Sequence, residues 1–302
     1  MVHRSAANES ALGRALAPAA FILIWASGYV VAKVTAPYAE PLGFLAWRFA
    51  GTATLMTVLA LLARAAWPSG RDTLHLVVAG VLMHACYLGC VWVAISQGMP
   101  AGVAALIVNL QPVLTAALAV FVGEQVTRRQ WLGVVAGFGG VVLVVGQKVA
   151  LAGPLLLGPT LLCLFGLAAM TAGTLYQKRF VPRFDLRAGQ AVQAIASFAL
   201  IWPAAAWLGS FRIDWNLPVI GAMLWSIVVL TGGGLSLMFL MLRDGRATTV
   251  TSYMYLVPAV TALMAWAMFG ESLEPLALAG MAVTLTGIWL VAGGRLDRRH
   301  PS

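Results

Sequence analysis

The sequence predicts an all-α integral membrane protein of ten transmembrane helices, built as two inverted five-helix repeats. Two observations predict this class: the composition of the chain and a set of landmarks that occurs twice. The 302 residues are 61% hydrophobic and only 10% charged, with a mean hydropathy of +0.89. A soluble domain carries about 25% charged residues, so this chain has too few to cover a surface that faces water.

The landmarks are glycines and a glutamate near the end of each half. They recur 147 positions apart, as the series Gly98, Gly123, Glu124, Gly133 and Gly140, and the series Gly245, Gly270, Glu271, Gly280 and Gly287. An apolar chain that repeats itself halfway is typical of transporters made from two fused copies of one helical unit.

A membrane-spanning helix needs roughly 20 apolar residues. The expected organisation is a tail at 1–17, a first repeat at 18–148, a second repeat at 149–293 and a tail at 294–302. The ten segments that meet the length requirement are 18–36, 42–66, 74–97, 101–122, 129–147, 154–178, 187–208, 218–242, 247–269 and 275–293.

The positions of Lys and Arg predict the orientation. Alternate links hold nearly all of them, whereas the other side holds only Lys33, Lys148 and Arg212, and Arg48 lies within a span. Basic links stay in the cytoplasm, so both termini are expected there. Because five is an odd number, the second copy enters the membrane from the opposite side. The net charge of +9 comes from scattered residues without a nucleic-acid motif, which argues against nucleic-acid binding.

Several segments resemble the drug/metabolite transporter superfamily, in its EamA branch. They are the runs 21–33 (FILIWASGYVVAK) and 110–118 (LQPVLTAAL), the pair Gly123-Glu124 followed by 130–133 (QWLG), and, in the second half, 257–263 (VPAVTAL) with Gly270-Glu271. The resemblance covers nearly the whole chain. It implies a ten-helix carrier of the bacterial inner membrane, often an exporter of amino acids or other small metabolites, and it identifies no substrate.

Pro112 and Pro258 each lie near the middle of a predicted span. Proline lacks an N–H, so each should break its helix and leave a carbonyl without its usual donor. Asn109 and Gln111 stand beside the first proline, and Tyr253 and Tyr255 stand before the second. Such breaks are tolerated where they are buried or line a wet cavity. The sequence thus predicts a substrate cavity here, with structural kinks and bonds between helices as the alternative.

His84 lies mid-span in the third segment, and Tyr87 is expected to share its face one turn later. His84 could contact a substrate or carry a proton, or it could be a neutral histidine bonded between helices. Trp25 and Tyr29 are further candidates for an aromatic pocket. Most other tryptophans are expected to be interface anchors or lipid-facing bulk.

Lys33, Glu40 and Arg48 form a possible group at the external ends of the first two spans. Arg48 could extend outward to meet Glu40, or it could anchor a substrate carboxylate. Lys33 and its repeat counterpart Lys178 are candidate gate residues on opposite faces. Glu124 and Glu271 are expected to cap or pair at helix ends.

All ten acidic residues fall in links or tails, so the commonest proton or sodium carrier inside a membrane is absent. The predicted function is alternating-access transport of a small organic molecule, by facilitated diffusion or exchange, with a proton-coupled antiporter that uses His84 as the alternative. A channel or a membrane enzyme fits less well. The expected partners are a small-molecule substrate and the lipid bilayer, and a homodimer stays open. No cofactor or metal site is expected, since Cys86 and Cys90 are too few ligands.

Overall fold

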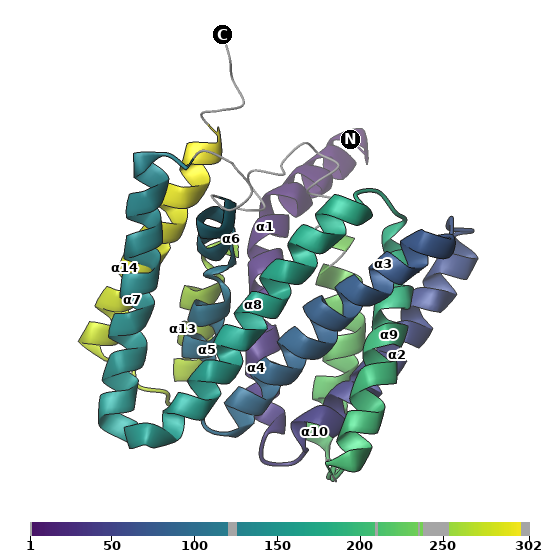
Figure 1. Ribbon diagram of the computed structural model, residues 1–302. Coiled ribbons are helices and arrows are strands. Elements are labelled where there is room, and N and C mark those ends of the chain that lie inside the picture. The colour runs from purple at the N-terminus through teal and green to yellow at the C-terminus, as the bar shows by residue number, and fades with distance from the viewer. Residues whose placement is uncertain (1, 120–125, 209–210, 235, 238–253, 297–302) are drawn as a thin grey trace.

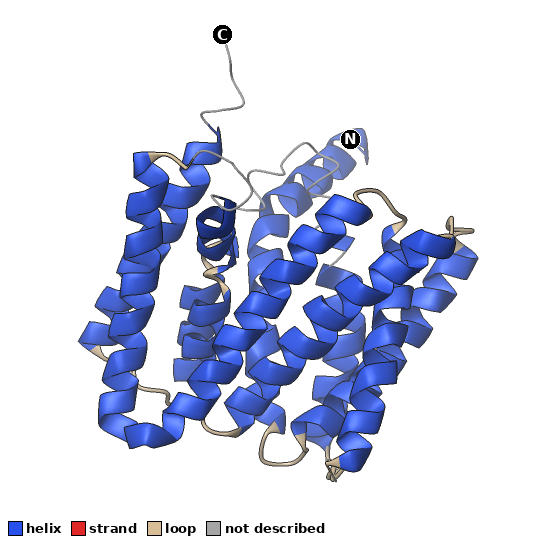
Figure 2. Cartoon of the chain, viewed as in Figure 1, coloured by secondary structure: helices blue, strands red, loops and turns tan. Residues whose placement is uncertain are grey.

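The computed structural model describes residues 2–119, 126–208, 211–234, 236–237 and 254–296. Within these ranges the regular structure is helical, and the helices lie side by side as one bundle (Figures 1 and 2). The helices are α1 (Val2–Thr35), α2 (Pro41–Leu62), α3 (Gly70–Gly80), η1 (Val81–Cys86), α4 (Tyr87–Ser96), α5 (Ala101–Val108), α6 (Gln111–Ala119), α7 (Arg128–Ala152), η3 (Gly153–Leu156), α8 (Leu157–Phe180), α9 (Leu186–Trp207), α10 (Leu217–Leu224), η4 (Trp225–Gly233), α13 (Val257–Phe269) and α14 (Pro275–Leu296).

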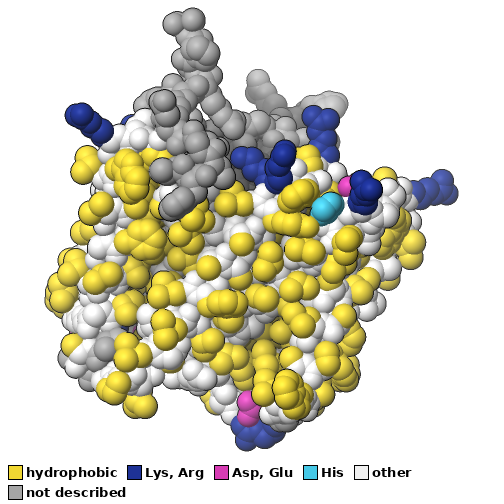
Figure 3. Space-filling model, viewed as in Figure 1, with side chains coloured by type: hydrophobic (Ala, Val, Ile, Leu, Met, Phe, Trp, Pro, Cys, Tyr) yellow, Lys and Arg dark blue, Asp and Glu magenta, His cyan; other side chains and the backbone are white. Residues whose placement is uncertain are grey.

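The helices have the length and surface of membrane spans. In the described part of the chain, seven are long and apolar enough to cross a bilayer, and the shorter apolar helices are Leu217–Gly233, Val257–Phe269 and Pro275–Val291. Figure 3 shows hydrophobic side chains over the middle of the bundle and Lys and Arg gathered at its ends, most of them at one end. That end also holds the start of α1 and the end of α14 (Figure 1). We call it the terminal end, and the opposite one the far end.

Two helix pairs pack most extensively, α7 with α14 and α2 with α9. Glycines allow the first pair to approach closely. A Cβ atom added to Gly133 would lie 2.6 Å from the Gly287 carbonyl oxygen. One added to Gly140 would lie 2.5 Å from the Gly280 carbonyl oxygen. The numbers rise along α7 as they fall along α14, so the two helices run antiparallel.

The helix breaks predicted at Pro112 and Pro258 are confirmed. One span is divided at Asn109 and Leu110 into α5 and α6, and Tyr255 and Leu256 form a turn before α13. In both places proline occupies the first turn of the following helix, where a missing N–H costs nothing because helix starts have no internal acceptor for it.

Two spans contain a π-helical segment, η1 in residues 81–86 and η4 in residues 225–233. Adding the repeat spacing of 147 to the residue numbers of η1 gives residues 228–233, which lie inside η4. A π-helix is wider than an α-helix, is rare, and is frequently found at functional sites. Both segments therefore place their side chains in directions that an α-helical periodicity does not predict.

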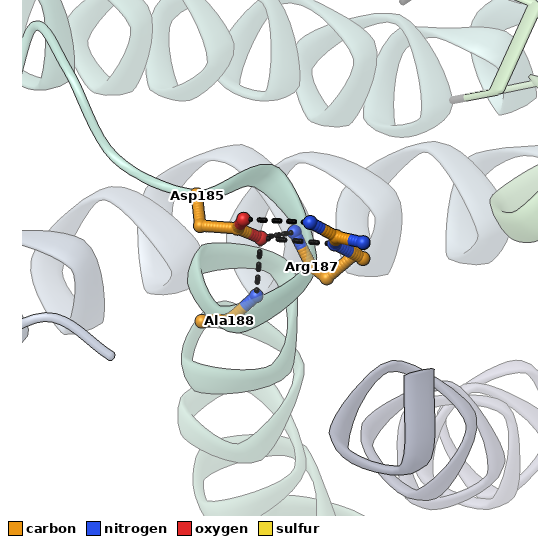
Figure 4. A network of polar contacts seen from close by, with 3 residues as sticks. All are labelled: Asp185, Arg187 and Ala188. Atoms are coloured by element: carbon orange, nitrogen blue, oxygen red, sulfur yellow. Dashed lines mark hydrogen bonds and ion pairs between the residues drawn. The ribbon is translucent and has the colours of Figure 1, made fainter. Parts of the chain in front are cut away.

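Asp185 starts α9 at the terminal end. Its carboxylate accepts hydrogen bonds from the backbone N–H of Arg187 at 2.9 Å and of Ala188 at 3.5 Å, and the Arg187 guanidinium closes an ion pair over it (Figure 4). These bonds serve backbone donors that a helix start leaves without partners. The Arg187 guanidinium is the main reason why the pKa of Asp185 lies below its ordinary value of 3.8.

At the far end, two links that are distant in sequence bond to each other. The Glu40 N–H donates to the Arg212 carbonyl, and the Asp214 N–H donates to the Tyr38 carbonyl. Trp47 lies beside Trp202 and Trp215 at this end, and all three are at least 36% exposed. Exposed tryptophans near helix ends are the expected anchors at a membrane–water interface.

Candidate functional site

Four of the predicted site residues come together from four helical segments, α1, α2, η1 and α4, inside the bundle. The Tyr29 hydroxyl of α1 lies 3.1 Å from the Tyr87 hydroxyl, at the start of α4. The Arg48 guanidinium of α2 is near enough to both Tyr87 and His84 to interact with them electrostatically. Tyr29 is 6% exposed and the other three are half-buried. The structure thus forms a polar cluster, made of Tyr29, Arg48, His84 and Tyr87, in a mostly apolar interior.

Arg48 lies against an aromatic surface. Its guanidinium carbon is 5.7 Å from the ring centroid of Trp92 on α4, and the Trp92 ring stacks on Phe44 with centroids 4.9 Å apart. A cation over an aromatic ring is attracted by the negative face of that ring. Phe44 lies one turn before Arg48 on α2, so one helix positions both the cation and the ring that stacks on Trp92.

His84 bonds to α9. Its Nε2 lies 3.2 Å from the Gln193 amide oxygen, and the Gln193 amide nitrogen donates to the Gln177 side chain of α8 at 2.6 Å. A carbonyl oxygen only accepts, so this geometry places the proton of His84 on Nε2. Gly80 makes the approach possible, since a Cβ there would lie 2.6 Å from the Gln193 Cα. His84 therefore makes the bond between helices that the sequence offers as the alternative to contact with a substrate or a proton.

His84 and Tyr87 point to different neighbours, contrary to the expectation that they share a face. His84 reaches α9, whereas Tyr87 reaches α1. The expectation assumed α-helical geometry. His84 lies in π-helical η1, in which each residue turns through a smaller angle, so the two side chains diverge around the axis.

The residues around the helix breaks bond both within their own helix and to a neighbouring helix. Gln111 donates to the Thr174 hydroxyl of α8 at 2.9 Å, while the Asn109 amide turns back to the Ala105 carbonyl of its own helix at 2.8 Å. Tyr255 is 9% exposed. Trp25 packs against Phe21, with ring centroids 5.5 Å apart. Tyr253 lies outside the described residues.

The expected contact between Arg48 and Glu40 is wrong, and so is the grouping of both with Lys33. The Lys33 ammonium lies 3.5 Å from the Glu271 carboxylate, beyond the end of α13. Glu271 also accepts from the Ala101 N–H at the start of α5 at 3.2 Å, which confirms its predicted capping and pairing role. Lys178 is exposed at the end of α8, and Glu124 lies outside the described residues.

Cavities lie at both ends of the bundle. One of about 770 Å³ lies at the terminal end, between the end of α2, the start of α9 and the end of η4. It is lined by Met56, Leu59, Leu62, Ala63, Phe184, Asp185, Leu186, Arg187, Gly232 and Ser236. A smaller one of about 240 Å³ lies at the far end and contains the Lys33–Glu271 pair. Lys148 crosses beside it to Glu274 at 3.6 Å.

Trp92, Gln177, Gln193 and Thr174 belong to the site, although they were not predicted as site residues. A signal for two of them was present in the sequence. The spacing of 145 that relates Lys33 to Lys178 also relates Arg48 to Gln193 and Tyr29 to Thr174. Carrying this spacing from the predicted residues to the second half would have found both.

A bundle of apolar helices that surrounds a polar cluster, with cavities at its two ends, is an arrangement suited to a membrane transporter. Comparison with known proteins agrees. The EamA-like transporter family matches the chain twice, at residues 15–146 and 158–293. The chain belongs to this family.

Relatives of full length carry transporter names. The uncharacterized transporter YvbV of Bacillus subtilis is 26% identical, over 92% of this chain and 90% of its own. A Salmonella typhimurium protein named "Probable amino-acid metabolite efflux pump" is 27% identical, over 92% and 94%. A solved crystal structure shares the fold with a TM-score of 0.65 at 19% identity, covering 95% of this chain and 98% of that one.

Proposed function

We propose that this protein is a carrier of the bacterial inner membrane that moves a small organic metabolite, an amino acid or a similar compound, by alternating access, in the direction of export. The proposed units are the five-helix repeats at 18–148 and 149–293, with the tails 1–17 and 294–302 in the cytoplasm. The terminal end would then face the cytoplasm and the far end the outside.

The observation that carries the proposal is the reciprocal glycine contact of α7 and α14. Gly133 and Gly140 have Gly280 and Gly287 as their repeat counterparts. Gly133 meets the counterpart of Gly140, and Gly140 meets the counterpart of Gly133. This is the contact that a two-fold axis between equivalent helices produces. Because the helices run antiparallel, a two-fold axis between them would lie in the membrane plane, which supports inverted repeats.

Two further features support inverted repeats. Helices α2 and α9 are both 22 residues long, start 145 positions apart and pack against each other. The family matches each half separately. Two units of the same fold in opposite orientations can exchange shapes, and that exchange opens a central site to one side and then to the other.

The two ends of the bundle differ in a way that fits one state of this cycle. At the far end, Lys33–Glu271 and Lys148–Glu274 tie α1 and α7 to the segment that follows α13, and the links around Glu40 and Arg212 bond to each other. At the terminal end lies the cavity of about 770 Å³. We assign this conformation to the state that faces the cytoplasm.

Counterflow in proteoliposomes tests the carrier mechanism. Vesicles loaded with an unlabelled amino-acid mixture should take up a labelled member of that mixture faster than empty vesicles, because a carrier returns loaded more readily than empty. Equal uptake into loaded and empty vesicles would indicate a channel. The relative's name makes amino acids the first solutes to test.

A further inference from the structure

The polar cluster contains a positive charge that no carboxylate of the described residues neutralises. Hydrogen bonds and ion pairs of the described residues leave the Arg48 guanidinium without a carboxylate, and its contact is the Trp92 ring. An arginine inside the membrane-spanning part of a protein is expensive unless a partner or a function retains it. Arg48 is therefore a candidate for contact with an anion that arrives from outside the protein.

The position of Arg48 favours the interior of the bundle over its lipid surface. Arg48 and Gln193 are repeat counterparts on the packed helices α2 and α9. His84 interacts with both, by a hydrogen bond to Gln193 and electrostatically with Arg48. The Trp92 ring that Arg48 contacts is buried as well, which places the guanidinium against the interior of the bundle.

The groups near Arg48 suit an anion. The Tyr29 and Tyr87 hydroxyls face each other at 3.1 Å, and at most one can donate to the other, so one of the two protons can point to a ligand. Arginine binds carboxylate with two parallel N–H bonds, and charged hydrogen bonds are stronger than neutral ones. The stacked Trp92 and Phe44 rings are buried, so they support the guanidinium from within the bundle.

The charge of the cluster also limits the class of anion. Arg48 is the one Lys or Arg that the described contacts place there, and His84 is engaged through Nε2 with an amide oxygen. One positive charge balances a carboxylate, whereas a phosphate monoester would bring up to two negative charges.

Building on the proposed transport function, we propose that Arg48 binds the carboxylate of the transported solute and makes the protein selective for organic monocarboxylates over their neutral analogues. The Trp92 ring supports the guanidinium, and the tyrosine pair supplies a hydroxyl donor. The site accepts amino acids through their carboxylate, and equally carboxylates that have no amino group.

The test compares carboxylates with their amides. Purified protein is mixed with L-phenylalanine, L-leucine, phenylacetate, phenylalaninamide, leucinamide and phenylacetamide, and the thermal unfolding midpoint and the counterflow of each labelled compound are measured. We expect at least one carboxylate to raise the unfolding midpoint and to exchange. The corresponding amide should bind more weakly by a factor of about ten or more.

Variants assign the selectivity to Arg48. Arg48→Gln should remove the preference for the carboxylate, while Arg48→Lys, which keeps the charge, should retain part of it. Arg64→Gln, at an exposed arginine after the end of α2, is the matched control and should behave as wild type. Arg48→Gln should also elute as a single species with a wild-type midpoint without ligand, which separates loss of binding from loss of folding.

Each contrary result has its own meaning. Exchange of an amide as fast as its carboxylate, or an unchanged preference in Arg48→Gln, overturns the carboxylate site and leaves the carrier in place. Exchange of neutral or cationic compounds alone does the same. No exchange of any compound in the panel contradicts both the carboxylate site and the proposed carrier of amino acids.

Discussion

The Lys33 ammonium and the Glu271 carboxylate lie 3.5 Å apart and join α1 to the end of α13 at the far end of the bundle. The pair borders the cavity of about 240 Å³, into which Leu106 and Ala262 also face. Glu271 adds a hydrogen bond to the first turn of α5. One carboxylate thus connects three helices at the place where an outward-facing state would have to open.

Removing this carboxylate should open the far end. In a background without the three native cysteines, a cysteine at Leu106 should react with a membrane-impermeant thiol reagent several times faster in Glu271→Gln than with Glu271 intact. The loss of stability should be small, about 1 kcal/mol or less, because partly exposed ion pairs contribute little. Lys178→Ala, at the exposed repeat counterpart of Lys33, is the control. Equal labelling rates in all three proteins would contradict a gate here.

The glycine contact of α7 and α14 should be sensitive to a single added methyl group. A Cβ at Gly287 would overlap the Gly133 carbonyl oxygen at 2.6 Å, so Gly287→Ala must separate the helices. We expect a loss of about 1–3 kcal/mol, typical of overpacking, measured as unfolding in detergent by circular dichroism. Gly139→Ala is the matched control on α7, because its Cβ would meet nothing within 4 Å. An equal change in both variants would contradict the contact, because the gain in helix propensity from Gly to Ala is the effect that the two substitutions share.

Asp185 should stabilise the protein in a pH-dependent way. Its pKa in the folded protein lies below the ordinary value of 3.8, mainly because of the hydrogen bond from Arg187. Its contribution is therefore complete above that value and is lost as the pH falls through the folded pKa. Asp185→Ala should cost about 1 kcal/mol at pH 7, the usual value of a helix cap. The difference from wild type should shrink below pH 4. A difference that stays constant down to pH 3 would contradict this role.

The substitution His84→Gln tests whether transport is coupled to protons. Glutamine can still donate to the Gln193 amide oxygen, so His84→Gln should keep the bond between helices and the unfolding midpoint. If protons are coupled through His84, wild-type counterflow should vary with pH, and the variant should show a flat profile. The same pH profile in wild type and variant would exclude coupling through His84.

The local features of this fold could be predicted from the sequence. Pro112 and Pro258 end the hydrogen-bond pattern of the helices before them, so their breaks follow from backbone chemistry. The apolar runs similarly predict the spans. The pairing of Glu271 was also foreseeable, since a carboxylate near helix ends finds N–H groups and cations.

The contacts of the site depend on tertiary structure. Arg48 meets Trp92 rather than Glu40, because the packing of α2 against α4 decides where a long side chain lies. Gln193 bonds to His84 because Gly80 has no side chain and lets the α9 backbone approach closely. The two bonded residues are more than a hundred positions apart in the sequence. His84 and Tyr87 point in different directions because η1 is a π-helix, and a 3.6-residue periodicity in the sequence does not predict one.

The pairing of Arg48 with a neutral counterpart, Gln193, has an evolutionary consequence. An ancestral homodimer of single repeat units would have carried the same side chain at both positions. Fusion into one polypeptide frees each copy to mutate alone. A cation at one position and an amide at its counterpart thus require two copies that differ in sequence. After duplication, the residues that contact the solute can change in one copy while the helices of both copies keep the same arrangement.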